Sequence, residues 1–98
     1  MQIIHWGRAR KFFQKHRSAE IPLKQWRAAV QAADWQTFPD VRKTFSSADW
    51  VDGQIVFDIK GNDFRLIAIA RFRRGRVYVR HVLTHEEYDR GDWKVKRR

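Results

Sequence analysis

Four residues in the C-terminal third of the chain have the types that phosphate-ester chemistry requires. Arg65 and Arg80 each interrupt an apolar strand pattern, and a short polar segment then carries His85 and Tyr88. Attack of a ribose 2′-hydroxyl on the adjacent phosphate needs a base for that hydroxyl, a cation for the phosphorane and an acid for the departing oxygen. Arginine, histidine and tyrosine can supply all three functions. The pattern therefore indicates phosphate chemistry, of which this reaction is one example.

Arg80 is expected in the middle of its strand, on the side of the sheet that faces solvent. A guanidinium there can hold phosphate oxygens in a bidentate way, so Arg80 is the expected phosphorane clamp. Arg65, on the neighbouring strand, could take the same phosphate or the next one. The alternative is that both arginines are solvated or are paired with Asp58 or Asp63. The surplus of positive charge on the chain favours phosphate binding.

Histidine titrates near neutral pH, which suits His85 to proton transfer. Tyr88 follows three residues later and lies on the same side if the segment is helical. Its phenol could carry a proton, donate a hydrogen bond to a phosphate or stack on a base. The alternatives are a helix-capping role for His85 and a packing role for Tyr88 over the sheet edge. Which of the two is the base and which the acid stays open.

His81 is the less suitable histidine on sequence grounds. Strict alternation along its strand places it with Val79 and Leu83, on the face beneath the helices. The run from His81 to His85 lacks the glutamate of the H-E-x-x-H zinc motif, and the chain contains no cysteine. We therefore expect no metal ion and no cofactor.

Basic and polar residues around the sheet and its turns are expected to bind the RNA backbone, which supplies affinity but little sequence information. These candidates are Lys60, Asn62, Arg71, Arg73, Arg74, Arg76 and Lys94. A basic tail continues through Lys96, Arg97 and Arg98. Trp93 interrupts that tail and could either dock it against the domain or stack on a base.

The charge balance agrees with a nucleic-acid partner. The 98 residues include 21 Lys and Arg against 11 Asp and Glu, for a formal net charge of +10. Such an excess favours a polyanion, because each neutralised phosphate releases condensed counterions. The chain has no apolar run of the roughly 18 residues that a membrane span needs, and no leader pattern. Without cysteine, it is expected to be one cytoplasmic domain over 1–98 that does not contact a membrane.

The pattern predicts an α+β fold, with two N-terminal helices packed on one face of an antiparallel sheet. Helical spacing covers 9–16, and a cap at Ser18 would start a second helix that buries Trp26. Regular spacing is lost between 34 and 52, where we expect at most a short strand or a helical turn. Strands are expected over 2–5, 54–60, 64–72 and 76–83, with a hairpin turn at Asp52–Gly53 and a short helical segment after the last strand.

Period-two alternation assigns the strand residues to two faces. The face opposite the helices would be basic and open to water, as one face of an antiparallel sheet can be. It would carry Lys60, Arg65, Arg71, Arg76, Tyr78 and Arg80.

The segments N-x-x-R-L-I-A and V-Y-V-R-H-V-L-T-H-x-x-Y-D resemble the HigB toxins of bacterial toxin–antitoxin pairs. The resemblance is strongest over 55–93, and its motif includes His85 and Tyr88. It implies a RelE-like fold and an endoribonuclease that cleaves mRNA on the ribosome and inhibits translation. It also implies a cognate helix-turn-helix antitoxin of the HigA type. Ribosome dependence and the antitoxin come from the resemblance alone.

Two other functions fit the residues. A non-enzymatic RNA-binding module or ribosome-associated regulator would use the same basic face and would need neither His85 nor Tyr88. A DNA-binding repressor fits less well, because no helix pair shows a basic recognition helix.

Overall fold

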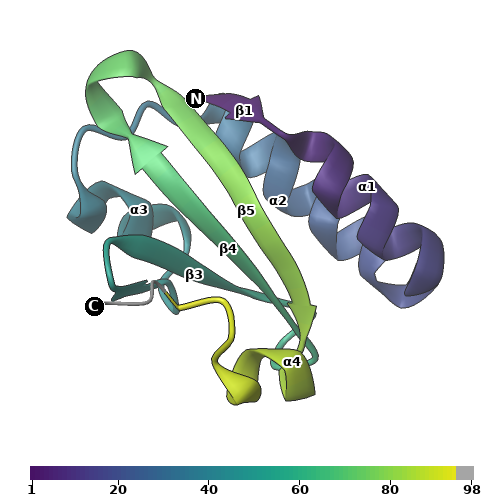
Figure 1. Cartoon of the computed structure of the whole chain (residues 1–98). Helices are drawn as coiled ribbons and strands as arrows, with labels where there is room; N and C mark the ends of the chain where they lie inside the picture. The colour runs from purple at the N-terminus through teal and green to yellow at the C-terminus, as the bar shows by residue number, and fades with distance from the viewer. Residues whose placement is uncertain (95–98) are drawn as a thin grey trace.

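The computed structural model describes residues 1–94 and shows a mixed five-stranded sheet with the two N-terminal helices on one face (Figure 1). The strands are β1 (Gln2–Ile4), β2 (Asp49–Val51), β3 (Gln54–Ile59), β4 (Phe64–Arg71) and β5 (Arg76–Thr84). The helices are α1 (Trp6–Lys15), α2 (Glu20–Ala32), α3 (Phe38–Thr44) and α4 (His85–Arg90). The spatial strand order is β1-β5-β4-β3-β2. The predicted α+β class, its two N-terminal helices and its short C-terminal helix are confirmed.

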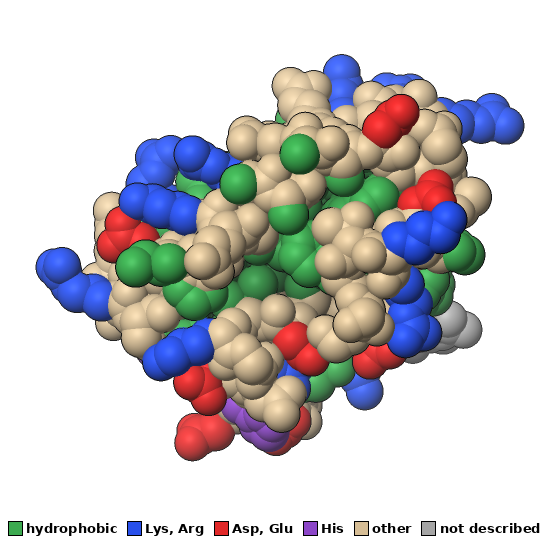
Figure 2. Space-filling model, turned by 180° about the vertical axis from the view of Figure 1, so that it is seen from behind, with side chains coloured by type: hydrophobic (Ala, Val, Ile, Leu, Met, Phe, Trp, Pro, Cys, Tyr) green, Lys and Arg blue, Asp and Glu red, His purple; other side chains and the backbone are tan. Residues whose placement is uncertain are grey.

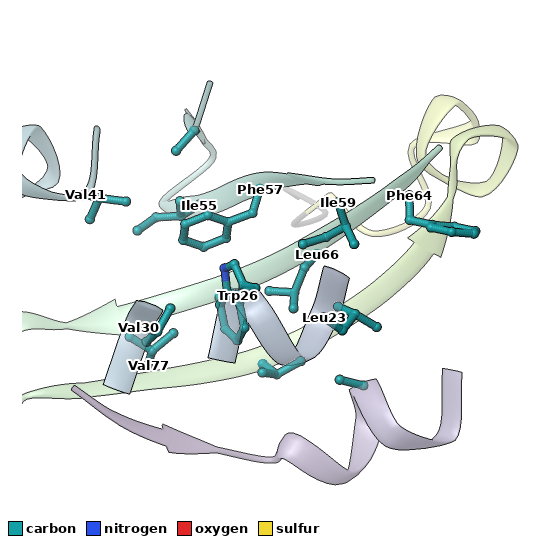
Figure 3. Packing of buried hydrophobic residues seen from close by; sticks show 14 of the residues in the cluster. Leu23, Trp26, Val30, Val41, Ile55, Phe57, Ile59, Phe64, Leu66 and Val77 are labelled. Atoms are coloured by element: carbon teal, nitrogen blue, oxygen red, sulfur yellow. The ribbon is translucent and has the colours of Figure 1, made fainter. Parts of the chain in front are cut away.

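The main core lies between α1, α2 and the sheet. Leu23, Trp26 and Val30 recur at helical spacing along α2 and are buried, as predicted for Trp26. They meet strand residues such as Phe57 and Leu66, and Figure 3 shows these side chains filling the space between helix and sheet. Burial of each such side chain stabilises the fold by about 1.5–3 kcal/mol. The packing on this face therefore determines how the strands lie against the helices.

The edge strand β1 departs from the predicted antiparallel sheet. It pairs in parallel with β5, from Gln2 opposite Arg76 to Ile4 opposite Tyr78, whereas the other neighbouring strands are antiparallel. The chain then enters α1 directly after His5. This connection places the start of α1 beside the second half of β5.

A β-bulge in β5 changes the face assignment of the residues after it. Ala68 is paired with Val79 and Ile67 with His81, so Arg80 is the extra residue between them. Val79 belongs to the helix-side core, but Leu83 packs in a second cluster on the opposite face. The prediction that Leu83 lies beneath the helices is therefore wrong, and so is the same prediction for His81. One inserted residue inverts a period-two pattern.

The face opposite the helices is only partly open. Trp93 is 5% exposed and packs on Val56 and Ile67, and its Nε1 donates to the Tyr88 carbonyl oxygen at 2.9 Å. Of the two alternatives for Trp93, docking is the one observed. The C-terminal segment thus covers the β3–β4 half of this face, and the predicted basic open face is limited to the β4–β5 half.

The structure also differs from the sequence-based predictions at the start of α2 and between α2 and β3. Helix α2 has Ala19 at its N-cap, after a 3₁₀ turn at Arg17–Ala19, so the predicted Ser18 cap is wrong. The segment between α2 and β3 holds both a helix, α3, and a strand, β2. The hairpin turn at Asp52–Gly53 is confirmed, with φ of 51° and 78°. No helix within residues 1–94 is long and apolar enough to span a membrane.

Candidate active site

A hollow of about 530 Å³ opens beside β4 and β5, at the point where β1 passes into α1. We call it the arginine pocket; it is lined by His5, Arg8, Ile69, Arg71, Tyr78, Arg80 and His81. The lining contains three arginines, two histidines and one tyrosine but no acidic residue. Such a lining matches a phosphate group, which offers negative charge and several acceptor oxygens.

Arg80 combines exposure with the absence of an acidic partner. Within residues 1–94, no ion pair forms at Arg80 or Arg71, although five form elsewhere. A guanidinium that no carboxylate neutralises keeps its donors and its charge for an incoming anion. The predicted position of Arg80, on the face away from the helices, agrees with its place in this pocket.

Arg8 fixes the backbone of the bulge. Its Nη1 donates to the carbonyl oxygens of Val79 at 3.1 Å and of Arg80 at 3.2 Å. Strand β1 ends its pairing at Tyr78, so these carbonyls lie beyond the stretch that β1 covers. Arg8 therefore joins α1 to the strand segment that carries Arg80 and His81.

His81 lies in the arginine pocket and also borders a smaller hollow of about 160 Å³ that extends toward α4. Burial lowers the pKa of His81 below its usual value, and the charges of Arg80 and Arg8 lower it further. The imidazole is therefore neutral at neutral pH and can accept a proton.

His5 enters the pocket from the β1–α1 junction. Its φ of 66° is in the left-handed region, which histidine adopts more often than most residues but at some cost in strain. Its ring lies 6.2 Å from that of Tyr78, centroid to centroid. The backbone conformation thus holds the imidazole beside β5 at the pocket edge.

The other arginine of the predicted set occupies a closed environment, which we call the α4 corner and define by Asp58, Arg65, Tyr88 and Trp93. Arg65 is 9% exposed, and its Nε lies 3.1 Å from Asp58 Oδ1. Its guanidinium lies 5.2 Å from the ring centre of Tyr88, which stacks on Trp93 at 5.1 Å. The paired alternative for Arg65 is the one observed.

Tyr88 is held as a neutral phenol in this corner. Burial raises its pKa, and the nearby Arg65 opposes that rise only in part. The packing alternative for Tyr88 agrees with its stacking on Trp93. A protonated phenol can still donate a hydrogen bond or a proton.

His85 is the first residue of α4, but it does not cap the helix. Thr84 is the N-cap, and its side chain accepts from the Glu87 amide at 3.2 Å. The His85 ring is exposed, with Nδ1 3.0 Å from Asp89 Oδ2. The structure therefore separates the predicted set: Arg80 lies in the arginine pocket, Arg65 and Tyr88 meet in the α4 corner, and His85 pairs with Asp89.

The predicted RNA-binding residues are distributed over several sites. Arg71 lines the arginine pocket, and Arg76 is its cross-strand partner. Arg73 and Arg74 are exposed in the 3₁₀ turn between β4 and β5. These four arginines surround one end of the pocket strands and could extend a phosphate-binding track.

The other three RNA-binding candidates lie away from the arginine pocket. Lys60 pairs with Asp63 at 3.6 Å, and Asn62 Oδ1 accepts from Arg65 Nη2 at 3.4 Å. The Lys94 ammonium lies 5.9 Å from the Trp93 ring centre. The predicted contribution of Lys96, Arg97 and Arg98 falls outside the described residues.

A hollow on the helix side has a different chemical character. It measures about 480 Å³ and lies between α2 and β3, with Trp26, Ala29, Phe45 and Ile59 in its lining. Figure 2, seen from behind, shows apolar side chains gathered near the middle of this side and Lys and Arg around its margin. The lining also includes Gln25, Lys60 and Asp58, and the carboxylate of Asp58 disfavours a phosphate there.

His5, Arg8 and His81 are the pocket residues that sequence reasoning missed. His5 and Arg8 reach the site only because β1 pairs in parallel with β5, and the local pattern around them gave no signal of that pairing. His81 was assigned to the helix side because the bulge was not foreseen. No group of three or more potential metal ligands occurs within residues 1–94.

Comparison with known proteins identifies the family. The family model described as HigB_toxin, the RelE-like toxic component of a toxin-antitoxin system, matches residues 19–91, about three quarters of the chain. The chain belongs to the HigB toxin family. This confirms the resemblance seen in the sequence, and the match ends just after α4.

Individual members of the HigB family give two kinds of match. The mRNA interferase toxin HigB of Escherichia coli K12 is 36% identical over 52 residues, which make up 50% of this chain and 50% of that protein. The mRNA interferase HigB of Escherichia coli O6:H1 is 27% identical over 93 residues, or 92% of this chain and 90% of that protein. The stronger match therefore covers only half the length of the relative.

Proposed function

We propose that this chain is the toxin of a toxin–antitoxin pair and acts as a metal-independent endoribonuclease on mRNA. The observation that carries the proposal is the arginine pocket, where Arg80 and Arg71 lack acidic partners among the described residues and histidines lie alongside. The names of the HigB relatives, which describe mRNA interferases, support the same activity.

In this function Arg80 holds the phosphate that is cut. As the 2′-hydroxyl attacks, charge grows on the non-bridging oxygens, and a guanidinium already in place stabilises that charge without reorganising. Two histidines follow Arg80 along the chain: His81 in the pocket and His85 on α4. The proposal made from the sequence gives proton transfer to His85 and Tyr88, with Arg65 as a second phosphate contact. In the structure the Arg65 guanidinium instead lies 5.2 Å from the ring centre of Tyr88.

The partners follow from the family. The substrate is mRNA bound to the ribosome, so that cleavage inhibits translation, and a HigA-type helix-turn-helix antitoxin neutralises the toxin in the cytoplasm. The net charge of +10 supports this placement, because ribosomal RNA would attract such a surface.

The test is induced expression in cells, followed by mapping of new mRNA 5′ ends, for wild type and Arg80→Ala. Wild type should create new ends and arrest growth, while a folded Arg80→Ala protein should do neither. Purified products should carry 2′,3′-cyclic or 3′-phosphate ends because the ribose oxygen is the nucleophile. Products with 3′-hydroxyl ends would contradict the chemistry.

The alternative function is a non-enzymatic RNA-binding or ribosome-associated regulator. The same unpaired arginines support it. It predicts that wild type binds RNA or ribosomes and inhibits translation with no new 5′ ends, so the mapping experiment separates the two functions.

A further inference from the structure

We propose that His5 and His81 are the acid–base pair of the arginine pocket, with His81 as the general base and His5 as the general acid. This assignment rests on the proposed ribonuclease function and deepens it. It transfers the proton-transfer role from α4 to two residues that reach the pocket from opposite ends of the chain.

His5 and His81 lie where the chemistry would occur. Both imidazoles line the same hollow as Arg80, where the phosphate would lie, and they approach it from different elements. His5 comes from the β1–α1 junction, and His81 comes from β5 just after the bulge. In-line displacement needs a base near the attacking oxygen and an acid near the leaving oxygen, on different sides of the phosphorus. Two histidines from separate elements meet that need.

The fold specifically supports the positions of both histidines. The bulge turns His81 away from the helix-side core, and Arg8 holds the bulge carbonyls at 3.1 and 3.2 Å. His5 is held in the left-handed region at φ 66°. Irregular backbone of these two kinds is costly and concentrates at functional sites.

The electrostatic environment of His81 suits a general base. The nearby cations Arg80 and Arg8 favour its neutral form before substrate binds. Once the negatively charged phosphorane forms, that charge favours the protonated form of His81. The ionisable groups that border it are Arg80 and Tyr78 on β5, Arg71 on β4, His5 and Arg8 at the start of α1, Glu87 and Arg90 on α4, and Asp92 after it.

In the proposed reaction, neutral His81 takes the proton of the 2′-hydroxyl as the O2′–P bond forms. The P–O5′ bond breaks, and His5 gives a proton to O5′, which leaves a 2′,3′-cyclic phosphate and a 5′-hydroxyl. Proton exchange with water then returns both imidazoles to their starting forms. No metal or external reductant enters the step.

His85 fits this role less well. It does not line the arginine pocket, and its Nδ1 is engaged by Asp89 on the same helix. The pairing leaves Nε2 free, so what argues against His85 is its place outside the lining of the arginine pocket.

The experiment compares His81→Gln, His5→Asn and His85→Gln in single-turnover cleavage of a short mRNA, programmed into ribosomes if free RNA is not cut. Asparagine is chosen for position 5 because it tolerates the left-handed region. A second substrate carries sulfur in place of the bridging 5′ oxygen at the cleavage site. A thiolate leaves without a proton, so this substrate does not require the acid.

With the normal substrate, His81→Gln and His5→Asn should each lower the rate about 10²-fold or more. The sulfur substrate should restore His5→Asn to near the wild-type rate but leave His81→Gln impaired. The wild-type rate should rise with pH up to a point below about 6.5, and His81→Gln should lose that rise. His85→Gln separates this pair from the assignment of proton transfer to His85 and Tyr88. It should lower the rate less than tenfold, and a loss as large as that of His81→Gln would return proton transfer to α4.

Two other outcomes would also overturn the assignment. One is a His81→Gln or His5→Asn protein that cleaves within a few-fold of wild type. The other is loss in both without rescue of His5→Asn by sulfur. If wild type cleaves in either case, the ribonuclease function survives and only the acid–base pair is wrong. If wild type leaves free and ribosome-bound RNA intact, the function itself fails.

Discussion

The arginine pocket and the α4 corner use the same residue type for different purposes. Arg80 and Arg65 both belong to the face opposite the helices, on neighbouring strands, and both interrupt an apolar pattern. Arg65 has Asp58 directly across from it on β3 and an aromatic ring above it. Arg80 sits in a bulge with no cross-strand partner, in a hollow without acids.

The difference shows that the neighbour across the strand determines what a strand arginine does. Burying a guanidinium without a carboxylate partner costs free energy. Arg65 can be buried because the carboxylate of Asp58 neutralises its charge. An exposed guanidinium loses little hydration and can remain unpaired until an anion binds. Each prediction below tests one side of this contrast.

The largest effect is expected for Arg65→Ala, which should lower the free energy of unfolding by about 3 kcal/mol because it leaves Asp58 without its partner and removes the support of Tyr88. Urea denaturation measures this. The matched variant Arg65→Met also loses the ion pair with Asp58 but keeps most of the apolar volume against Tyr88, so it should cost less, and the loss that remains reports the ion pair. Equal stability of Arg65→Ala and wild type would show that the α4 corner does not depend on the ion pair.

Arg80→Ala should lower the cleavage rate but not the stability, which is the opposite of what is expected for Arg65→Ala. Loss of the phosphorane contact should lower the cleavage rate about 10²-fold, equivalent to about 2.7 kcal/mol, while the urea midpoint stays close to wild type. The matched control is Arg10→Ala, which removes an exposed arginine of α1 outside the pocket lining. If both variants cleave equally well, the pocket has no special role.

Thr84→Ala should cost about 1 kcal/mol by removing the capping box of α4. Because α4 carries Tyr88, the loss should appear as faster amide exchange in α4 and around Trp93, with β5 protected as before. Thr84→Ser keeps the hydroxyl and serves as the control. Uniformly faster exchange across the sheet would mean that α4 is not an independently opening unit.

A smaller effect is expected on the stability of the fold at low pH. The hydrogen bond from the Thr84 amide at 2.9 Å holds the pKa of Glu87 below its usual range. A depressed pKa stabilises the fold above the unfolded-state value, and that stability is lost as pH falls through the folded-state value. Wild type should therefore lose more stability than Glu87→Gln between about pH 5 and pH 3. Parallel melting curves for the two proteins over that interval would contradict this.

Much of the fold could be predicted from the sequence because its signals are local. The helical spacing that buries Trp26, the strand alternation of β3 and the Asp52–Gly53 turn each depend on a few neighbouring residues. The parallel pairing of β1 with β5 could not be predicted this way, because it joins residues more than seventy positions apart. Nor could the bulge, since its sequence, V-R-H-V, fits regular alternation equally well.

The site was predicted in part for the same reason. Arg80 was found because a charge within an apolar strand is visible locally, and its predicted face agrees with the structure. Arg65 carried the same signal, but only the β3–β4 register reveals that Asp58 neutralises it. His5 and Arg8 gave no signal at all, because their relevance arises from the sheet topology.

The shortness of the two edge strands has a consequence for how the molecule meets copies of itself. Strands β1 and β2 each present three residues of outer edge. The outer edge of β5 beyond Tyr78 has no strand beside it, but α1 packs against β5 and Arg8 donates to the carbonyl oxygens of Val79 and Arg80. Long unpaired edges template the addition of further strands and lead to aggregation, and short ones offer too few hydrogen bonds to do so. Together with the mutual repulsion of molecules that each carry a net charge of +10, this geometry disfavours edge-to-edge growth into fibrils.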